Sequence, residues 1–233
     1  MKQYYNDITA RVQQVRENIE VAANKVGRKA SEVTLLGVTK TQSAQAVRQL
    51  LQAGVTDIGE NRVQELLQKE PFLEDLPHTT HLIGHLQRNK AKFLPGHISM
   101  LQSLDSPKTL QAVEKAFATQ NKPLDVLIEV NIGDEASKSG VSVPELEQLV
   151  ELTVASPVVR LRGLMAIPPI CEGDLVRRYF EQIYHLFVDI KAKKMDNKAI
   201  NILSMGMSAD YGYAVMEGAT MVRVGSTLFG PRI

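Results

Sequence analysis

Apolar residues alternate along this chain between two patterns, short continuous runs and longer stretches with spacings of three and four residues. The short runs predict buried strands, and the spaced stretches predict helices with one apolar face. We expect eight strands, over 33–38, 55–58, 79–83, 98–101, 124–130, 158–165, 199–203 and 220–224. Helical patterns alternate with these runs, and a further one over 8–26 precedes the first strand. Eight strand-and-helix units with short connections predict an α/β fold, a TIM (β/α)8 barrel with an extra N-terminal helix.

Local patterns predict three helix starts and one further helix. Ser43 is expected to cap a helix that ends near Gly54, and Ser142 with Glu145 has the form of a capping box. A helix that contains Lys90 and Phe93 and runs to Pro95 is also expected between the third and fourth strands. Ser208 is expected to cap a helix that runs through residue 215.

A doubly wound open sheet is the alternative for such an alternating chain. Its fingerprint, Gly-x-Gly-x-x-Gly after the first strand, is missing, because that turn reads Thr39-Lys40-Thr41-Gln42. The 233 residues suit a single barrel, and neither a linker nor a low-complexity segment interrupts them. We therefore expect one domain over 1–233.

Charge and cysteine content narrow the class of partner. The 27 basic and 26 acidic residues leave a net charge of +1, which favours neither nucleic acid nor an anionic membrane as a partner. No apolar run approaches the roughly 20 residues of a membrane span, and the first residues lack the apolar core of a signal peptide. Cys171 is the single cysteine, which excludes an internal disulfide and fits a reducing compartment. We expect a cytoplasmic protein.

Two loops at the expected C-terminal mouth of the barrel have the composition of an anion site. The loop after the seventh strand contains Gly206 and Ser208, and the loop after the eighth contains Gly225 and Ser226. Phosphate groups favour these two loops in barrels, and exposed amides at helix starts bind anions. Either loop alone could be only a cap or a turn, but their joint occurrence favours a phosphate site.

Lys40 ends the first strand directly after an apolar run. A lysine there is either a solvated charge or a reactive amine in a pocket. In a closed barrel the first strand neighbours the eighth, so this amine can reach a ligand anchored by Gly225 and Ser226. A partly desolvated amine can form a Schiff base with an aldehyde. Phosphate together with aldehyde points to pyridoxal 5′-phosphate.

Arg223 on the eighth strand would then lie near the pyridine nitrogen of that cofactor. An arginine there keeps the nitrogen unprotonated and weakens the ring as an electron sink. The alternative is an ion pair between Arg223 and a barrel carboxylate such as Glu129. The motifs of other chemistries, Walker loops, His-Glu-x-x-His and Gly-x-Ser-x-Gly, are missing, and the five histidines show no metal-ligand spacing.

Several segments together resemble the pyridoxal-phosphate homeostasis protein family, the single-barrel relatives of the alanine racemase N-terminal domain. The resemblance covers essentially the whole chain and rests on Leu36–Thr41, Gly59–Glu65, His81–Lys90, Glu129–Asn131, Lys138–Gly140, Gly163–Met165, Leu203–Ser208 and Val222–Gly225. It implies that Lys40 forms the Schiff base and that Arg223 lies at the pyridine nitrogen. Ser208, Gly225 and Ser226 would hold the phosphate, and Asn61 and Met205 would be further pocket residues. The chain departs from the family pattern at Thr80, where tryptophan is common, at Gln42-Ser43 and in lacking a charged tail.

The resemblance implies a role in vitamin B6 and amino-acid homeostasis, with possible transfer of cofactor to apo enzymes. Racemisation on this scaffold needs acid–base groups on both faces of the cofactor, and by analogy the second comes from a C-terminal β domain. Because the chain ends a few residues after the eighth strand, we expect a monomer that holds cofactor without catalytic turnover. The alternatives are a slow amino-acid racemase or other Schiff-base enzyme, and a barrel aldolase or epimerase acting on a sugar phosphate.

Overall fold

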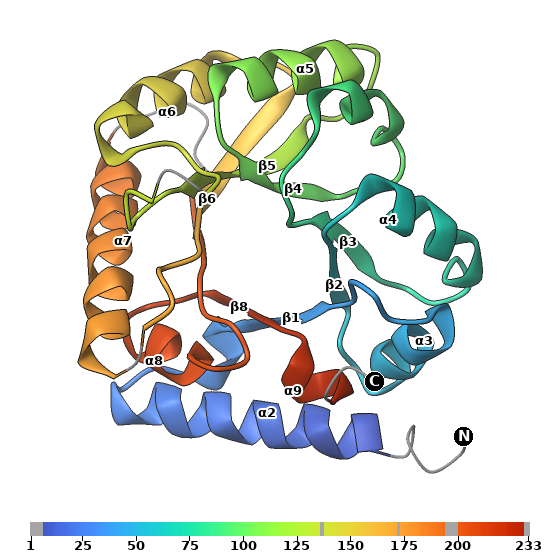
Figure 1. Ribbon diagram of the computed structural model, residues 1–233, viewed down its shortest axis with the longest axis vertical. Helices are drawn as coiled ribbons and strands as arrows, with labels where there is room; N and C mark the ends of the chain where they lie inside the picture. Colours follow the sequence, from blue (N-terminus) through green and yellow to red (C-terminus); the bar gives the residue numbers. More distant parts are fainter. Residues whose placement is uncertain (1–6, 136–137, 172, 194–199, 231–233) are drawn as a thin grey trace.

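Eight parallel strands close into a barrel in sequence order, with β1 paired to β8 (Figure 1). The computed structural model describes residues 7–135, 138–171, 173–193 and 200–230. The strands are β1 (Thr34–Val38), β2 (Asp57–Glu60), β3 (Thr79–Leu82), β4 (Met100–Leu104), β5 (Leu124–Val130), β6 (Val159–Ala166), β7 (Ile202–Ser204) and β8 (Met221–Val224). The predicted barrel is confirmed, and residue 199 of the expected seventh strand lies outside the described residues.

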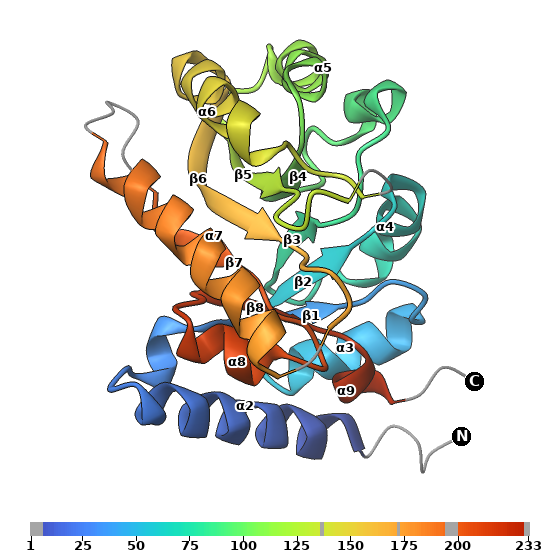
Figure 2. The same cartoon turned by 60° about the vertical axis from the view of Figure 1, so that its left-hand side comes forward.

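The helices surround the barrel, and short 3-10 turns join several of them to the strands (Figures 1 and 2). The α-helices are α2 (Asp7–Lys25), α3 (Ala44–Gln52), α4 (Val63–Lys69), α5 (Pro107–Phe117), α6 (Leu146–Ala155), α7 (Asp174–Ala192), α8 (Tyr211–Met216) and α9 (Ser226–Phe229). The 3-10 turns are η1 (Ala30–Glu32), η2 (Glu70–Phe72), η3 (Arg88–Phe93) and η4 (Val143–Glu145). No helix in these ranges is both long and apolar enough to cross a membrane.

The extra N-terminal helix α2 lies outside the barrel against α8, α9 and α3. Its inward face consists of the predicted stripe Ile8, Val12, Val15, Ile19 and Ala22, all buried. Val26 was expected to continue this stripe, but the helix ends at Lys25 and the side chain of Val26 is exposed. Gly27 turns the chain away from the helix with a φ of +70°, a conformation that residues with a Cβ rarely adopt.

Two strands extend further toward the C-terminal mouth than their apolar runs indicated. β2 continues through Glu60, which is buried and paired with Lys69, and β4 continues through Gln102 and Ser103, which are buried and hydrogen-bonded. The apolar pattern ends before these residues because charged and polar side chains are rarely buried without partners. Partners on other strands and helices cannot be seen in a local pattern.

Two of the local helix predictions need correction. Residues 88–93 form the 3-10 turn η3, in which Ala91 is the buried residue, so the segment lacks the apolar face of a packed α-helix. Ser142 starts a 3-10 turn and makes no side-chain cap to the backbone; its hydroxyl donates to the carboxylate of Glu145. Ser43 does cap α3, because its Oγ accepts the N–H of Ala46 at 3.2 Å.

The apolar core is divided by the barrel wall. The larger part lies between the strands and the surrounding helices and includes Leu35, whereas the neighbouring residue Leu36 packs in a small separate cluster with Ile83 and Met221. Successive residues of a strand point to opposite faces, so this second cluster lies inside the barrel. The interior therefore has only small apolar clusters, and buried polar side chains fill much of the remaining space.

Candidate cofactor site

A cavity of about 310 Å³ opens where β1, β2, β3, β6, β7 and β8 end. Its lining residues are Val38, Lys40, Gln42, Asn61, Ile83, Ile167, Met207, Ser208, Ala209, Arg223, Gly225, Ser226 and Gly230. This is the C-terminal face of the barrel, where the strand ends of this fold build ligand sites, and the volume suits a small molecule. Of the predicted site residues, only Met205 is not in this lining.

Lys40 lies two residues beyond β1 and its side chain is half-buried. Leu36 of β1 is in register with Arg223 of β8, and a Cβ added to Gly225 would lie 3.2 Å from the Cβ of Val38. The ends of β1 and β8 are therefore in close contact, as we predicted from a closed barrel in which the first strand neighbours the eighth. Within the described part of the chain, the amine of Lys40 forms no hydrogen bond or ion pair, so it is available to a ligand.

Ser208 does not cap the following helix, which corrects the prediction. The helix α8 begins at Tyr211, and Asp210 precedes it and accepts the N–H of Met207 at 2.6 Å. The Oγ of Ser208 instead accepts the N–H groups of Gly225 at 3.2 Å and Thr227 at 3.3 Å. Ser208 thereby joins the two loops that the sequence marked as an anion site.

The contacts of Ser208 decide how this hydroxyl can act toward a ligand. A serine oxygen has two lone pairs and one O–H. The N–H groups of Gly225 and Thr227 occupy both lone pairs, which leaves the O–H as a donor. The hydroxyl of Ser208 is therefore set up to donate to an acceptor such as an anionic oxygen.

Arg223 is buried inside the barrel and reaches the cavity. Its guanidinium donates to Ser204 Oγ at 2.7 Å and to the carbonyl of Ala166 at 2.9 Å. Among the described residues it forms no ion pair with Glu129, so the alternative interpretation is not supported. Burial lowers the pKa of Arg223 to about 10, against the attraction of Glu129 and Asp210. The guanidinium stays cationic at neutral pH, and it has more N–H donors than these two hydrogen bonds use.

A chain of buried hydrogen bonds runs from Arg223 across the barrel interior. Ser204 Oγ donates to Gln102 Oε1 at 2.7 Å, and Gln102 Nε2 donates to His81 Nδ1 at 2.9 Å. His81 Nδ1 is therefore an acceptor, which makes Nε2 the protonated nitrogen that donates to Asp57 at 3.2 Å. Each group in this series of hydrogen bonds donates to the next one, from Arg223 toward Asp57, and the series fixes the orientation of Arg223.

Glu129 lies buried in the barrel beside this chain. Burial, together with repulsion from Asp105, raises its pKa from 4.5 to about 7, although Arg223 attracts the charged form. Its Oε2 has no hydrogen-bond partner among the described residues. Glu129 is therefore a carboxyl that ionises near neutral pH, close to the buried guanidinium of Arg223.

Several lining residues were not predicted from the sequence. Gln42, Ile83, Ile167 and Met207 all follow the C-terminal end of a strand within a few residues. Position after a strand was therefore the signal that could have found them, independent of residue type. Met205 instead packs fully buried in the main apolar core.

The barrel belongs to the class of folds that the N-terminal domain of alanine racemase represents. The family model described as alanine racemase, N-terminal domain, matches residues 11–232. Alanine racemase from Corynebacterium glutamicum has the same fold, with a TM-score of 0.69 at 15% identity over 94% of this chain and 61% of that one.

Closer relatives identify the family. A pyridoxal phosphate homeostasis protein of Aquifex aeolicus is 41% identical over 223 residues, 95% of this chain and 97% of that protein. Its namesake in Escherichia coli K12 is 39% identical over 230 residues, 97% of each chain. The solved structure of PipY from Synechococcus elongatus with pyridoxal phosphate bound has a TM-score of 0.84 at 31% identity, covering 96% of this chain and 100% of that one. The chain belongs to the pyridoxal phosphate homeostasis protein family.

Proposed function

We propose that this protein binds pyridoxal 5′-phosphate through a Schiff base to Lys40 and acts in vitamin B6 and amino-acid homeostasis. The observation that carries the proposal is the amine of Lys40, which has no partner among the described residues and shares one cavity with Ser208 and Arg223. The names of the relatives and the cofactor bound to PipY support it.

The phosphate end of the cofactor fits the two loops that Ser208 joins. Ser208 offers its O–H, and Ser226 adds an exposed hydroxyl beside Gly225. These groups are hydrogen-bond donors for an anionic oxygen, and loops after the seventh and eighth strands are the usual phosphate site of this fold. Inorganic phosphate should therefore compete with the cofactor for this end of the cavity.

The ring and the aldehyde fit the rest of the cavity. Val38, Ile83 and Ile167 supply apolar walls, and Lys40 supplies the amine. Bound pyridoxal phosphate contributes an aldehyde and a pyridine ring that can withdraw electrons. Asn61 lies in the same lining and completes the set of polar groups around the ring.

Arg223 supports storage of the cofactor over turnover of amino acids. Its pKa of about 10 keeps it cationic, so it would offer an N–H donor to the ring nitrogen of a bound cofactor, which would favour the unprotonated nitrogen. An unprotonated ring withdraws electrons less, which disfavours carbanion formation. We therefore propose a cytoplasmic, monomeric protein that holds the cofactor, passes it to apo enzymes and has no substantial catalytic turnover.

Absorbance and chemical trapping test this function. Purified protein incubated with pyridoxal phosphate should turn yellow, and borohydride should fix one cofactor per chain, located by peptide mass mapping. Lys40→Ala should abolish the adduct, whereas Lys115→Ala, which changes an exposed lysine of α5, should leave it intact. A wild-type protein that takes up no cofactor would refute the proposal, and rapid loss of optical activity from L-alanine would refute the lack of turnover.

A further inference from the structure

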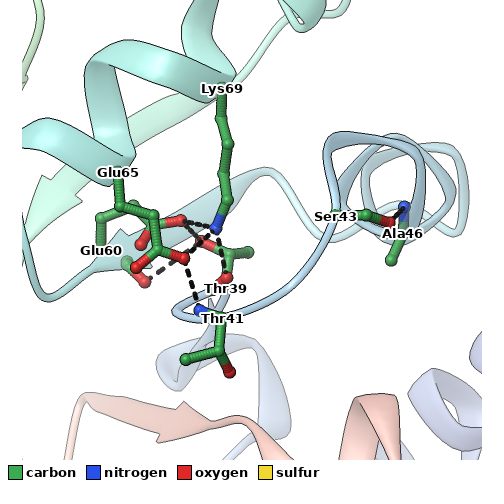
Figure 3. Close-up of polar contacts among 8 residues, drawn as sticks. Thr39, Thr41, Ser43, Ala46, Glu60, Glu65 and Lys69 are labelled. Carbon is green, nitrogen blue, oxygen red and sulfur yellow. Dashed lines mark hydrogen bonds and ion pairs between the residues drawn. The ribbon is translucent and has the colours of Figure 1, made fainter.

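The two peptide groups that flank Lys40 are both held by one cluster of charged side chains, which we call the 60/65/69 cluster: Glu60, Glu65 and Lys69 (Figure 3). The amine of Lys69 reaches down from the end of α4 and lies between the two carboxylates. It donates to Glu60 Oε1 at 2.7 Å and to Glu65 Oε1 at 2.6 Å.

The peptide before Lys40 is held through Thr39. Lys69 Nζ donates to the carbonyl oxygen of Thr39 at 2.7 Å, and the hydroxyl of Thr39 lies 2.7 Å from Glu60 Oε1. The N–H of Thr39 donates to the carbonyl of Gly59 at 2.9 Å. Every polar group of Thr39 therefore contacts β2 or the cluster.

The peptide after Lys40 is held through Thr41. Its N–H donates to Glu65 Oε1, the same oxygen that accepts from Lys69. Thr41 has a φ of +64°, a left-handed conformation that is rare for a β-branched residue. Such a conformation persists only where its surroundings determine it, and Glu65 supplies that contact.

Two members of the cluster are buried, Glu65 is half-buried, and the cluster lies apart from the cavity. Glu60 is 2% exposed and Lys69 is 9% exposed, and none of the three side chains is in the cavity lining. Buried ion pairs contribute little net stability compared with apolar residues of similar size, so burial alone does not explain three charged groups here. Their contacts converge on the backbone of residues 39 and 41, on both sides of the cofactor lysine.

We propose that Lys69, together with Glu60 and Glu65, is a positioning cluster that fixes the backbone on both sides of Lys40 and so directs its amine into the cavity. The inference rests on the proposed role of Lys40 as the Schiff-base lysine. The three residues act through the backbone and do not touch the cofactor.

A double-mutant cycle separates positioning from general damage to the fold. Cofactor affinity is measured by absorbance titration for Lys69→Met in two backgrounds, wild type and Lys40→Ala. With Lys40 present, we expect about a tenfold loss of affinity, because a charge-assisted hydrogen bond to the loop is removed. In the Lys40→Ala background only non-covalent binding remains, and the change should be less than about twofold.

A pair of substitutions at Glu65 gives a second test if Lys69→Met folds poorly. Glu65→Ala removes the acceptor of the Thr41 N–H and should slow borohydride-trapped adduct formation about tenfold. Glu65→Gln keeps an acceptor oxygen and should restore the rate to within about threefold of wild type. As a matched control, Asp125→Asn breaks ion pairs with Arg160 and Arg162 near the start of β5 and should leave the rate unchanged.

The outcomes distinguish the two proposals. Equal affinity losses for Lys69→Met in both backgrounds, or equal rates for Glu65→Ala and Glu65→Gln, would overturn the positioning role while leaving Lys40 as the Schiff-base lysine. A wild-type protein that binds no pyridoxal phosphate would overturn both.

Discussion

Two lysines lie on opposite sides of the loop after β1, and they differ in how many hydrogen-bond partners their amines have. On the cavity side, Lys40 is half-buried and its amine has no partner among the described residues. On the other side, Lys69 is buried and its amine donates to three oxygens. An amine with its donors satisfied contributes to the structure, whereas an amine without partners in a cavity is available for chemistry. The difference in partners therefore separates the two roles.

The largest expected effect is on stability, because removing one member of a buried ion cluster leaves the others charged and unpaired. Lys69→Met should lower the free energy of unfolding by about 3–5 kcal/mol. Lys40→Met should change it by less than about 0.5 kcal/mol, because the amine forms no hydrogen bond or ion pair with the residues that the structure describes. Urea denaturation measures both, and equal losses would break the comparison between the two lysines.

Buried carboxyls extend the comparison to pH. Burial raises the pKa of Glu60 even though Lys69 and Thr39 bond to it. Glu129 has no ion pair in the described chain, and its pKa is raised to about 7 from 4.5. Between these two values the folded state holds a proton that the unfolded state releases. The contribution of Glu129 to the free energy of unfolding is therefore fully present below about pH 4.5 and is lost as the pH rises through about 7. The loss is at most on the order of 3 kcal/mol.

Glu129→Gln tests this pH dependence. Denaturation at about pH 5.5 and about pH 8 should show a smaller difference in the free energy of unfolding for the variant than for wild type. An identical difference in both proteins would assign the pH dependence to another group. Asp125→Asn serves as the control carboxyl substitution at the other end of the barrel.

The smallest expected effect concerns two serines that both accept backbone N–H groups. Ser208→Ala removes the donor aimed at the phosphate end and should weaken binding of pyridoxal phosphate about tenfold. Ser43→Ala removes the cap of α3, costs about 1 kcal/mol of stability and should leave cofactor affinity unchanged. Isothermal titration with the cofactor distinguishes them, and equal affinities would remove Ser208 from the phosphate site.

The sequence predicted the barrel and most of the polar residues of the cavity lining because both depend on local order along the chain. Apolar runs identify strands, and in a closed parallel barrel the residues that follow strands meet at one mouth. Lys40, Arg223 and the loop of Gly225 were found in this way.

Long-range contacts account for what was missed. The pairing of Glu60 with Lys69 makes a charged strand end stable inside the fold, and the bonds from Gly225 to Ser208 turn an expected cap into a bridge between loops. Such partners are distant in sequence and depend on the closed barrel. The resemblance to a known family identified the segments that contain Glu60, Ser208 and Gly225, but not Lys69, and it gave no reason for their contacts.

The most direct test of the account is where the cofactor becomes attached. Protein saturated with pyridoxal phosphate is reduced with borohydride, digested and mapped by mass spectrometry. We predict a single modified lysine, Lys40, with Lys69 unmodified in the same digest. An adduct distributed over several surface lysines, or located on Lys69, would contradict it.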